Sequence, residues 1–208
     1  MVKYYVFPYL ANIPAPVRPV EVRPDHPYRK IEGFYEFKPE ELKNYSTYKT
    51  NEHHLTTATI WNIVFPKFMK DFNLDYNIDD YIYVNNIQDG FDLSYHNYNK
   101  EMNLLVISEG EIYTHLRDIG GTQLTAYHRL FIAPHKISVI FNSEALTDRI
   151  IRLNCDSMII PLIPLIVPYF KKIYVYDYRN NYIFKETPDI TDELNAYISY
   201  NFNKVFGL

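Results

Sequence analysis

Strand, turn and helix follow one another in Ile150-Ile151-Arg152-Leu153-Asn154-Cys155-Asp156-Ser157 and its continuation Met158-Ile159-Ile160-Pro161-Leu162-Ile163-Pro164-Leu165-Ile166. This is the arrangement in which a serine sits on a strand-to-helix turn. Pro161 and Pro164 fit the first turn of the helix, because the N–H groups there have no intrahelical partner. Ser157 would then face the positive end of the helix dipole, where an oxyanion could form. The alternative is that Asp156 or Ser157 only caps the helix, and this stretch alone favours the cap.

Further apolar runs of strand length predict a sheet around this strand. They are Leu104–Ser108, Ile137–Phe141 and Ile173–Tyr176, and Tyr81–Val84 is a further short strand between turn residues. Near-continuous Val, Ile and Leu is typical of strands that are covered on both faces, as in a parallel sheet. The runs therefore predict an α/β protein with three layers, a mostly parallel sheet and helices on both faces.

Two segments carry helix signals. Apolar residues recur at three- and four-residue spacing from Thr57 to Phe72, and Pro66 within this segment should kink or split the helix. The second predicted helix runs from Thr191 to Phe206, because Thr-Asp-Glu is a start signal and Gly207 a stop signal.

The composition excludes several classes of protein. The 208 residues are 47% hydrophobic and 22% charged with a formal net charge of −4, which is typical of a globular chain and not of a disordered one. Without a run of Lys and Arg, we expect neither nucleic acid as a partner nor a polybasic patch for a membrane surface. The most apolar stretch, Met158 to Phe170, is too short to span a bilayer and contains three prolines, so we expect no direct membrane insertion. The single Cys155 excludes an intrachain disulfide and a cysteine-based zinc site. Twenty-one tyrosines and thirteen phenylalanines suit a surface that binds sugars.

Residues 8–39 are rich in proline, which favours extended backbone. We therefore expect residues 1–44 to form an N-terminal arm packed on a domain of residues 45–208. The first residues, Met1 to Pro8, lack the features of a secretory signal peptide. The location therefore stays open: the chain could be a fragment, a domain of a longer polypeptide, or a cytoplasmic protein.

A serine nucleophile needs a base, and the base needs an orienting group. The stretch Glu52-His53-His54-Leu55-Thr56 lies just before the first predicted helix. In an extended segment residues two apart point the same way, so Glu52 could set the tautomer of His54. Two surface or capping imidazoles are the alternative, and zinc is disfavoured because no further ligand lies at suitable spacing.

Together these segments resemble the DHHW family of SGNH-type proteins, which are related to the alginate O-acetyltransferases of bacterial cell envelopes. The family pattern is Thr-Asp-His-His-Trp-Thr before a helix, then a strand, Asp-Ser, a helix with Pro-x-Leu, and a strand that closes with Asp-x-Arg. This chain has Glu52 to Thr56, then Asp156-Ser157 before the proline-containing apolar stretch, and finally Asp177-Tyr178-Arg179. The resemblance covers roughly residues 45–180, and its acid and histidine also precede the serine.

The resemblance implies an SGNH-hydrolase-like, flavodoxin-like fold and assigns a role to each matching position. Ser157 is the nucleophile, His54 the general base and then acid, and Glu52 the orienting carboxylate in place of the family's aspartate. Leu55 stands where the family has tryptophan. An alternative register pairs Asn51 with the family aspartate and makes His53 the base, but it loses the His-His match and Thr56.

The expected activity is that of a serine esterase or O-acetyltransferase that acts on acyl esters of a carbohydrate or cell-envelope polysaccharide. Acetyl is the expected acyl group. Arg179 and Asp156 are the candidate substrate-binding residues, although an Asp177–Arg179 contact could be structural. No cofactor or metal is expected, and the partners are the polysaccharide and an acyl donor. The alternative is an impaired, carbohydrate-binding or assembly protein on the same scaffold. The remaining histidines, among them His26 and His96, are expected on the surface or in loops.

Overall fold

The computed structural model describes residues 1–8, 23–42, 55–85, 87–88, 91–92, 94–108, 111–113, 137–156, 161–177, 194–199 and 205–206. The strands are β1 (Val2–Val6), β2 (Phe34–Glu36), β3 (Tyr81–Val84), β4 (Ile87–Gln88), β5 (Phe91–Asp92), β6 (Tyr95–Tyr98), β7 (Leu104–Ser108), β8 (Glu111–Tyr113), β9 (Ile137–Asn142), β10 (Ile150–Cys155), β11 (Lys172–Asp177) and β12 (Leu194–Ser199). The helices are α1 (Pro39–Leu42), α2 (Thr57–Thr59), α3 (Phe65–Asp71) and α5 (Ile163–Ile166), with the π-helical η2 (Ile60–Val64) and the 3-10 turns η1 (Pro27–Lys30), η3 (Ile78–Asp80) and η6 (Val167–Tyr169).

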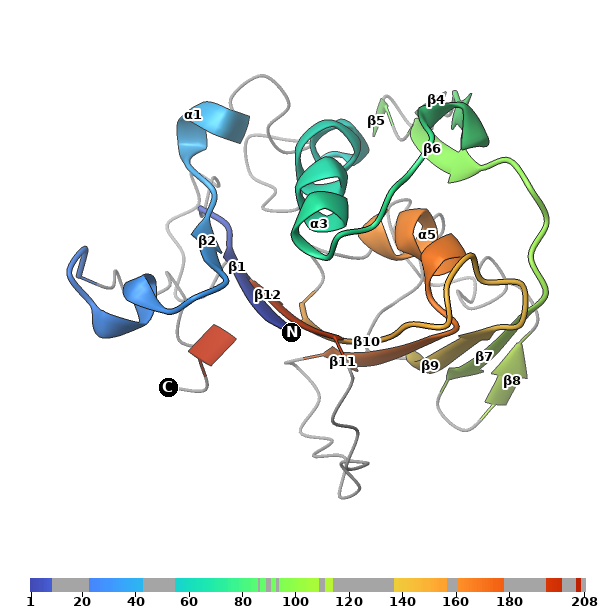
Figure 1. Cartoon of the computed structure of the whole chain (residues 1–208). Coiled ribbons are helices and arrows are strands. Elements are labelled where there is room, and N and C mark those ends of the chain that lie inside the picture. The colour runs from blue at the N-terminus through green and yellow to red at the C-terminus, as the bar shows by residue number, and fades with distance from the viewer. Residues whose placement is uncertain are drawn as a thin grey trace.

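The main sheet has eight strands in the order β2-β1-β12-β10-β11-β9-β7-β8 (Figure 1). Neighbouring strands from β2 to β11 are parallel. Strand β9 is antiparallel to both β11 and β7, and β8 is antiparallel to β7. The sheet is therefore mostly parallel, and the apolar strand β10 lies between β12 and β11 near its centre.

The N-terminal residues contribute strands to this sheet. Strand β1 lies between β12 and β2, with Val6 opposite both Ser199 and Glu36. The residues of 1–44 that the structure describes thus supply one end of the sheet, while the division of the chain at residue 44 stays a prediction.

One face of the sheet is covered by the helical run α2–η2–α3, which extends from Thr57 to Asp71 and confirms the first predicted helix. Pro66 has no N–H group, so it cannot bond to the carbonyl four residues back. The turn before it is π-helical, with the N–H of Phe65 bonded to the carbonyl of Ile60. The expected disturbance at Pro66 is therefore a π-helical turn that keeps the helix continuous. Asn73, with a φ of 52°, ends the run in the left-handed conformation.

The opposite face carries a smaller cluster. Val6 packs there with Val205, and the rings of Tyr4, Tyr28 and Phe206 stack around them. Helical residues thus lie on both faces, since Tyr28 belongs to η1 and residues 205–206 are helical. The three-layer α/β architecture predicted from the sequence is confirmed.

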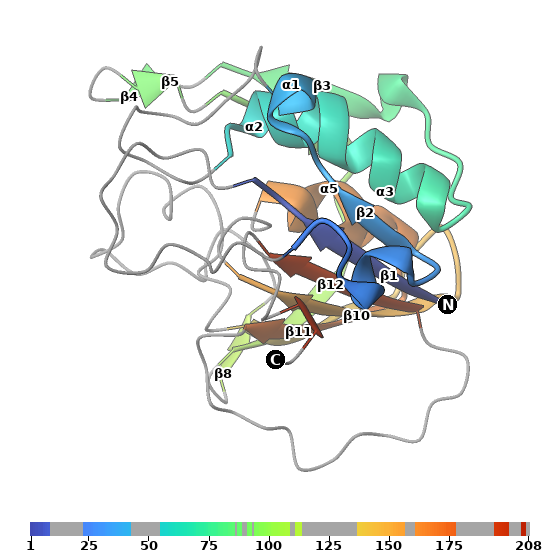
Figure 2. The same ribbon diagram turned by 90° about the vertical axis from the view of Figure 1, so that its left-hand side faces the viewer.

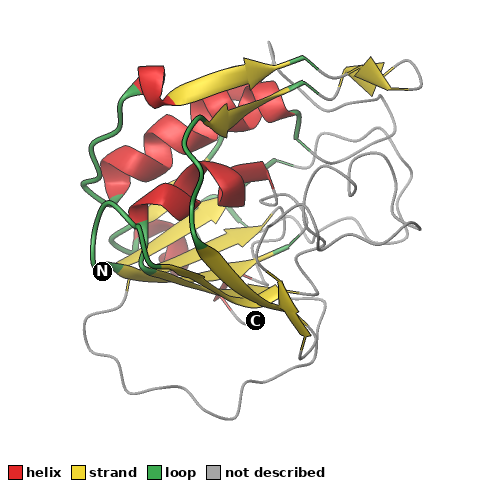
Figure 3. Cartoon of the chain, turned by 90° about the vertical axis from the view of Figure 1, so that its right-hand side faces the viewer, coloured by secondary structure: helices red, strands yellow, loops and turns green. Residues whose placement is uncertain are grey.

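A β-hairpin lies outside the helices. Strand β3 pairs with β6 and β4 with β5, and Figure 3 shows this hairpin above the helical layer. The Trp61 ring of η2 stacks flat on His96 of β6, with ring centroids 3.9 Å apart and an interplanar angle of 5°. The Tyr81 hydroxyl donates to the Leu165 carbonyl at 2.7 Å, which joins the hairpin to α5. His96, expected on the surface or in a loop, is half-buried in a strand.

Two expectations about secondary structure were wrong. The segment predicted as a helix from Thr191 to Phe206 contains strand β12, in which Leu194, Ala196 and Ile198 are buried and the residues between them are half-buried. This two-residue period, together with pairing to β1 and β10 on either side, outweighs the local helix start signal. The apolar runs of β7 and β9 were also expected in parallel pairs but pair antiparallel.

Candidate active site

The carboxyl ends of the parallel strands lie along one edge of the sheet. Cys155, the last residue of β10, pairs with Ile198 of β12 and with Asp177 of β11. In open α/β sheets, ligands bind beyond this edge. Asp156 is the next residue, so the segment that carries Ser157 leaves the sheet at the edge where a site is expected.

Asp156 is held in place at this edge. It is 2% exposed, and its Oδ2 accepts a hydrogen bond from the Ser199 hydroxyl at 2.5 Å. This distance lies in the range of hydroxyl–carboxylate bonds, which are stronger than hydrogen bonds between neutral groups. The described contacts of Asp156 are therefore structural, and its suggested part in substrate binding stays a prediction.

The two faces of β10 differ in character. Ile151, Leu153 and Cys155 are fully buried in the main core, which also contains residues of α3. The residues between them, Arg152 and Asn154, are half-buried on the other face. The Arg152 guanidinium lies 5.3 Å from the centre of the Tyr176 ring. The strand therefore presents apolar side chains to the helix and polar ones to the opposite face, where Ser199 and Asp156 also meet.

The helix that follows His54 begins at the same edge. At its far end the Arg149 guanidinium, just before β10, donates to the carbonyl of Phe72. From Thr57 to Asp71 the run is about 22 Å long at a helical rise of 1.5 Å per residue, and β10 is about 20 Å long at 3.3 Å per residue. The run is antiparallel to β10, so its start lies near the carboxyl edge, as Figure 2 shows.

The start of this helix is well fixed. Thr56 is the N-cap residue, and its Oγ1 accepts a hydrogen bond from the N–H of Thr59 at 3.1 Å. The Thr57 hydroxyl donates to the carbonyl of Ser94, which ties the helix to the outer hairpin. Leu55 is fully buried in the main core. The residue directly after His54 therefore has a defined place in the core close to the carboxyl edge.

The chain becomes helical again soon after Ser157. Residues 161–169 form a 3-10 turn, α5 and η6 in succession, and Pro161, Leu162 and Ile163 are buried. Pro164 lies at the start of α5, where its missing N–H costs no intrahelical bond. The predicted order of strand, turn and proline-opened helix is confirmed for the residues on both sides of 157–160.

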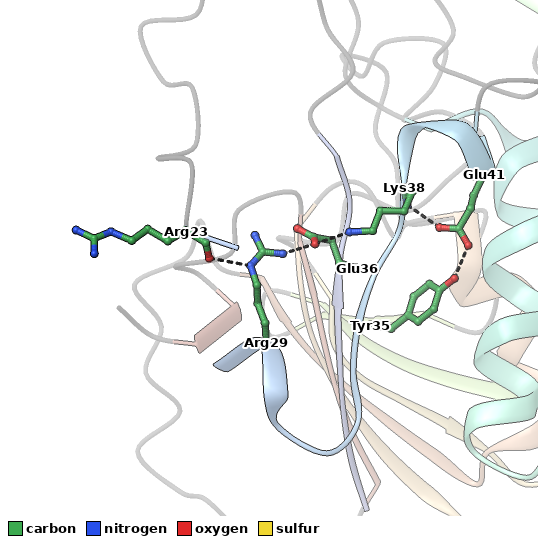
Figure 4. Close-up of polar contacts among 6 residues, drawn as sticks. All are labelled: Arg23, Arg29, Tyr35, Glu36, Lys38 and Glu41. Atoms are coloured by element: carbon green, nitrogen blue, oxygen red, sulfur yellow. Dashed lines mark hydrogen bonds and ion pairs between the residues drawn. The ribbon is translucent and has the colours of Figure 1, made fainter. Parts of the chain in front are cut away.

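A hollow of about 500 Å³ lies at the end of the sheet and is lined by Pro24, Arg29, Phe34, Tyr35, Glu36 and Lys38. Figure 4 shows Arg29 and Lys38 both paired with the Glu36 carboxylate, the latter at 2.8 Å. Burial by itself would raise the pKa of Glu36, but hydrogen bonds from Lys38 and Arg29 outweigh it and lower the pKa. The carboxylate therefore neutralises one of the two cations, and the hollow keeps a small positive excess.

Tyr35 and Lys38, which line this hollow, also make hydrogen bonds to Glu41 of α1. The Tyr35 hydroxyl donates to Glu41, whose other oxygen accepts from the N–H of Lys38 at 2.6 Å (Figure 4). Burial and the hydrogen bond to Glu41 raise the pKa of Tyr35 to about 12. Tyr35 is therefore protonated at neutral pH. These contacts hold α1 against β2 at the carboxyl edge.

Most residues that the sequence assigned to the site lie outside the described residues. These are Glu52, His54, Ser157 and Arg179, together with His53 of the alternative register. The described structure places their neighbours: Leu55 directly after His54, and Asp156 directly before Ser157. It also adds Ser199, which sequence reasoning missed because its segment was assigned to a helix. The alternating pattern from Leu194 to Ser199 is the signal that could have found it.

Among the described residues no three His, Cys, Asp or Glu side chains are grouped so that they could hold a metal ion. In the same part of the chain no helix has the length and apolar character to cross a membrane.

The sequence matches no known family model and no curated protein. Solved structures do resemble the chain. Bacillus cereus PatB1 is similar with a TM-score of 0.61 at 15% identity, over 84% of this chain and 71% of PatB1. A structure of the same protein with a sulfonyl adduct gives a TM-score of 0.58 at 15% identity, over 84% of this chain and 69% of that one.

A DHHW family protein from Eubacterium siraeum is also similar, with a TM-score of 0.56 at 14% identity over 98% of this chain and 78% of that protein. The chain has the fold of these proteins. The fold class expected from the motifs is therefore confirmed, and a DHHW family protein is among the structures that share it.

Proposed function

We propose that the protein is an SGNH-type serine esterase or O-acyltransferase in which Ser157 is the nucleophile, His54 the base and Glu52 the orienting carboxylate. One observation carries the proposal: the residue before Ser157 and the residue after His54 are both fixed near the carboxyl edge of the sheet. Two segments about a hundred residues apart in sequence thus reach the same edge of the sheet. Convergence of nucleophile and base is the first requirement of this chemistry.

The alternation along β10 favours the same arrangement. Ile151, Leu153 and Cys155 lie on the face covered by the helix, and Asp156 reaches Ser199 on the other. If the backbone stays extended for one more residue, this alternation predicts a Ser157 side chain on the helix-covered face. Leu55, the residue after His54, is buried in the core on that face, and α2 begins two residues later at Thr57. This supports the proposal that the His54 imidazole meets the Ser157 hydroxyl.

The proposed reaction has two halves. The Ser157 hydroxyl attacks the ester carbonyl carbon and its proton passes to His54, while backbone N–H groups near Ser157 stabilise the oxyanion. The bond to the leaving oxygen breaks, the leaving alcohol takes the proton from His54, and the acyl group stays on Ser157. A water molecule or a sugar hydroxyl then gives its proton to His54 and attacks the acyl carbon. Ser157 recovers its proton as the acyl bond breaks.

The similar structures support acyl chemistry on this fold. One of the PatB1 structures carries a sulfonyl adduct, and sulfonyl groups react with activated nucleophiles. The resemblance to the DHHW family extends the proposal to acetyl groups on a carbohydrate or cell-envelope polysaccharide, with an acyl donor as second substrate and no cofactor. A relation to the alginate O-acetyltransferases in particular rests on the sequence motifs alone.

The second candidate is a carbohydrate-binding or assembly protein without catalysis. It is favoured by Leu55, which stands at the family's tryptophan position and is buried in the core. A leucine with no exposed surface cannot line a substrate cleft. Glu52 in place of aspartate points the same way, since it is one methylene longer and a displacement of about 1 Å can cost on the order of 100-fold in rate.

The discriminating experiment is labelling of the folded protein with a fluorophosphonate probe, in which the Ser157 oxygen would bond to phosphorus and fluoride would leave. We expect labelling of the wild type, none in Ser157→Ala, and a strong loss in His54→Ala. His53→Ala is the matched control: retained labelling supports His54 as the base, and the reverse result moves the base to His53. Lack of labelling in folded wild type supports the binding protein.

The acceptor is identified in a second step. Hydrolysis of p-nitrophenyl acetate, followed by acetyl transfer to oligosaccharides, separates an esterase from a transferase. Acceptor choice depends on how well the site excludes water, so a transferase should acetylate the sugar even in aqueous buffer, where water is in large excess over the sugar.

A further inference from the structure

A buried polar pair stands at the exit of β10. Ser199 is 0% exposed, Asp156 is 2% exposed, and their side chains meet at 2.5 Å. The pair lies one residue beyond Cys155↔Ile198 in the register of β10 and β12. Asp156 is the first residue after β10, so this pair directly precedes residue 157.

The sheet does not need a polar pair at this place. In the same row of side chains the next strand contributes Val6, which is buried in an apolar cluster opposite Ser199. A buried carboxylate carries a desolvation penalty that only good hydrogen bonding offsets. Apolar residues of similar size would hold two strands together at least as well. What a hydroxyl–carboxylate bond adds is direction, because it fixes the Asp156 side chain in one orientation.

That orientation matters for the residue that follows. The bond to Ser199 holds the Asp156 side chain on the face away from α2, and in an extended chain the next side chain is expected on the opposite face. We infer that Ser199 is a positioning residue, whose hydrogen bond to Asp156 sets the direction in which Ser157 is presented to its base. This inference rests on the proposed function and adds to it a residue that touches neither substrate nor reacting atoms.

The test compares the reactivity of Ser157 in variants at position 199. Ser199→Ala removes the hydroxyl, and Ser199→Thr keeps it with a residue that favours strands. Ser199→Cys, which nearly keeps the volume but is a weak donor, replaces the alanine variant if that one does not fold. The matched control is Thr147→Val, three residues before β10 at its opposite end, which removes a half-buried hydroxyl that donates to the Tyr169 carbonyl at 2.5 Å.

We expect the fluorophosphonate labelling rate and kcat of Ser199→Ala, measured per folded molecule well below its melting temperature, to fall about tenfold to a hundredfold. KM should change much less than kcat, because in this inference Ser199 acts on the direction of Ser157 and does not touch the substrate. Ser199→Thr should recover most of the rate. Thr147→Val should lose stability and keep the labelling rate.

The outcomes separate this inference from the proposed function. Normal labelling of Ser199→Ala or Ser199→Cys overturns the positioning role and leaves the proposed function intact. Equal losses in Ser199→Ala and Thr147→Val also overturn it, since they would reflect strand stability alone. If folded wild type does not label, both proposals fail, because there is then no nucleophile to position.

Discussion

The N-cap at Thr56 links the stability of the fold to the candidate base, and its removal has a calculable effect. Thr56 Oγ1 accepts from the Thr59 N–H at 3.1 Å and lies 3.0 Å from the Thr59 hydroxyl. Replacing a threonine cap by alanine costs about 1 kcal/mol. For a domain of this size that corresponds to a melting temperature lower by about 2–4 °C. Thr56→Ala should therefore unfold at measurably lower temperature than the wild type.

The assay combines urea and thermal unfolding with the labelling rate of Ser157 per folded molecule. Thr56→Ser keeps the capping oxygen and should match the wild type, whereas Thr56→Val keeps the shape without a capping acceptor and should match alanine. Because His54 lies two residues before the cap, labelling should slow in the two variants that fray the helix start. Equal stability of the serine, valine and alanine variants would refute the capping argument. Slower labelling in the serine variant alone would refute the link to His54.

Three further perturbations test the packing and the charges. Phe68→Ala removes a fully buried ring from the core under the helix and should cost about 3–5 kcal/mol of unfolding free energy in urea. Against the opposing effect of burial, hydrogen bonds and ion pairs with Lys38 and Arg29 lower the pKa of Glu36 in the folded protein, so these pairs stabilise the fold at neutral pH and are lost as the pH falls through the lowered folded value. Glu36→Gln should therefore be less stable than the wild type at pH 7, and the difference should shrink as the pH is lowered into the acid range. Burial lowers the pKa of His96, so stability should decline as the pH falls below about 6.5, and His96→Phe, which keeps a ring on Trp61, should decline less between pH 7.5 and 5.5.

The strands with strong apolar patterns could be predicted from the sequence. Leu104–Ser108 and Tyr81–Val84 match β7 and β3, and the predicted helix from Thr57 matches α2–η2–α3. These segments carry their periodicity locally, and their burial follows from it. The order of strand, turn and helix around Asp156 could be predicted for the same reason, because proline is favoured in the first turn of a helix and marks where the helix begins.

What failed depended on partners far away in the chain. The segment that contains Leu194 to Ser199 begins with a valid helix signal, yet β1 and β10 offer it a backbone ladder on each side. No local pattern predicts that β9 pairs antiparallel with β11, because the direction of a strand depends on the path of the connection that precedes it. The stack of Trp61 on His96 has the same origin, as the two rings meet only once the outer hairpin folds over the helix.

The residue types in the chain by themselves determined a three-layer α/β architecture, the strand that leads to Ser157 and the motifs that suggest acyl transfer. Only the tertiary structure decided which segments share the carboxyl edge, and it paired Ser199 with Asp156 there. The physical reason is that hydrophobic periodicity is a local property of about ten consecutive residues. Strand order and buried polar pairs depend instead on contacts between residues far apart in the sequence.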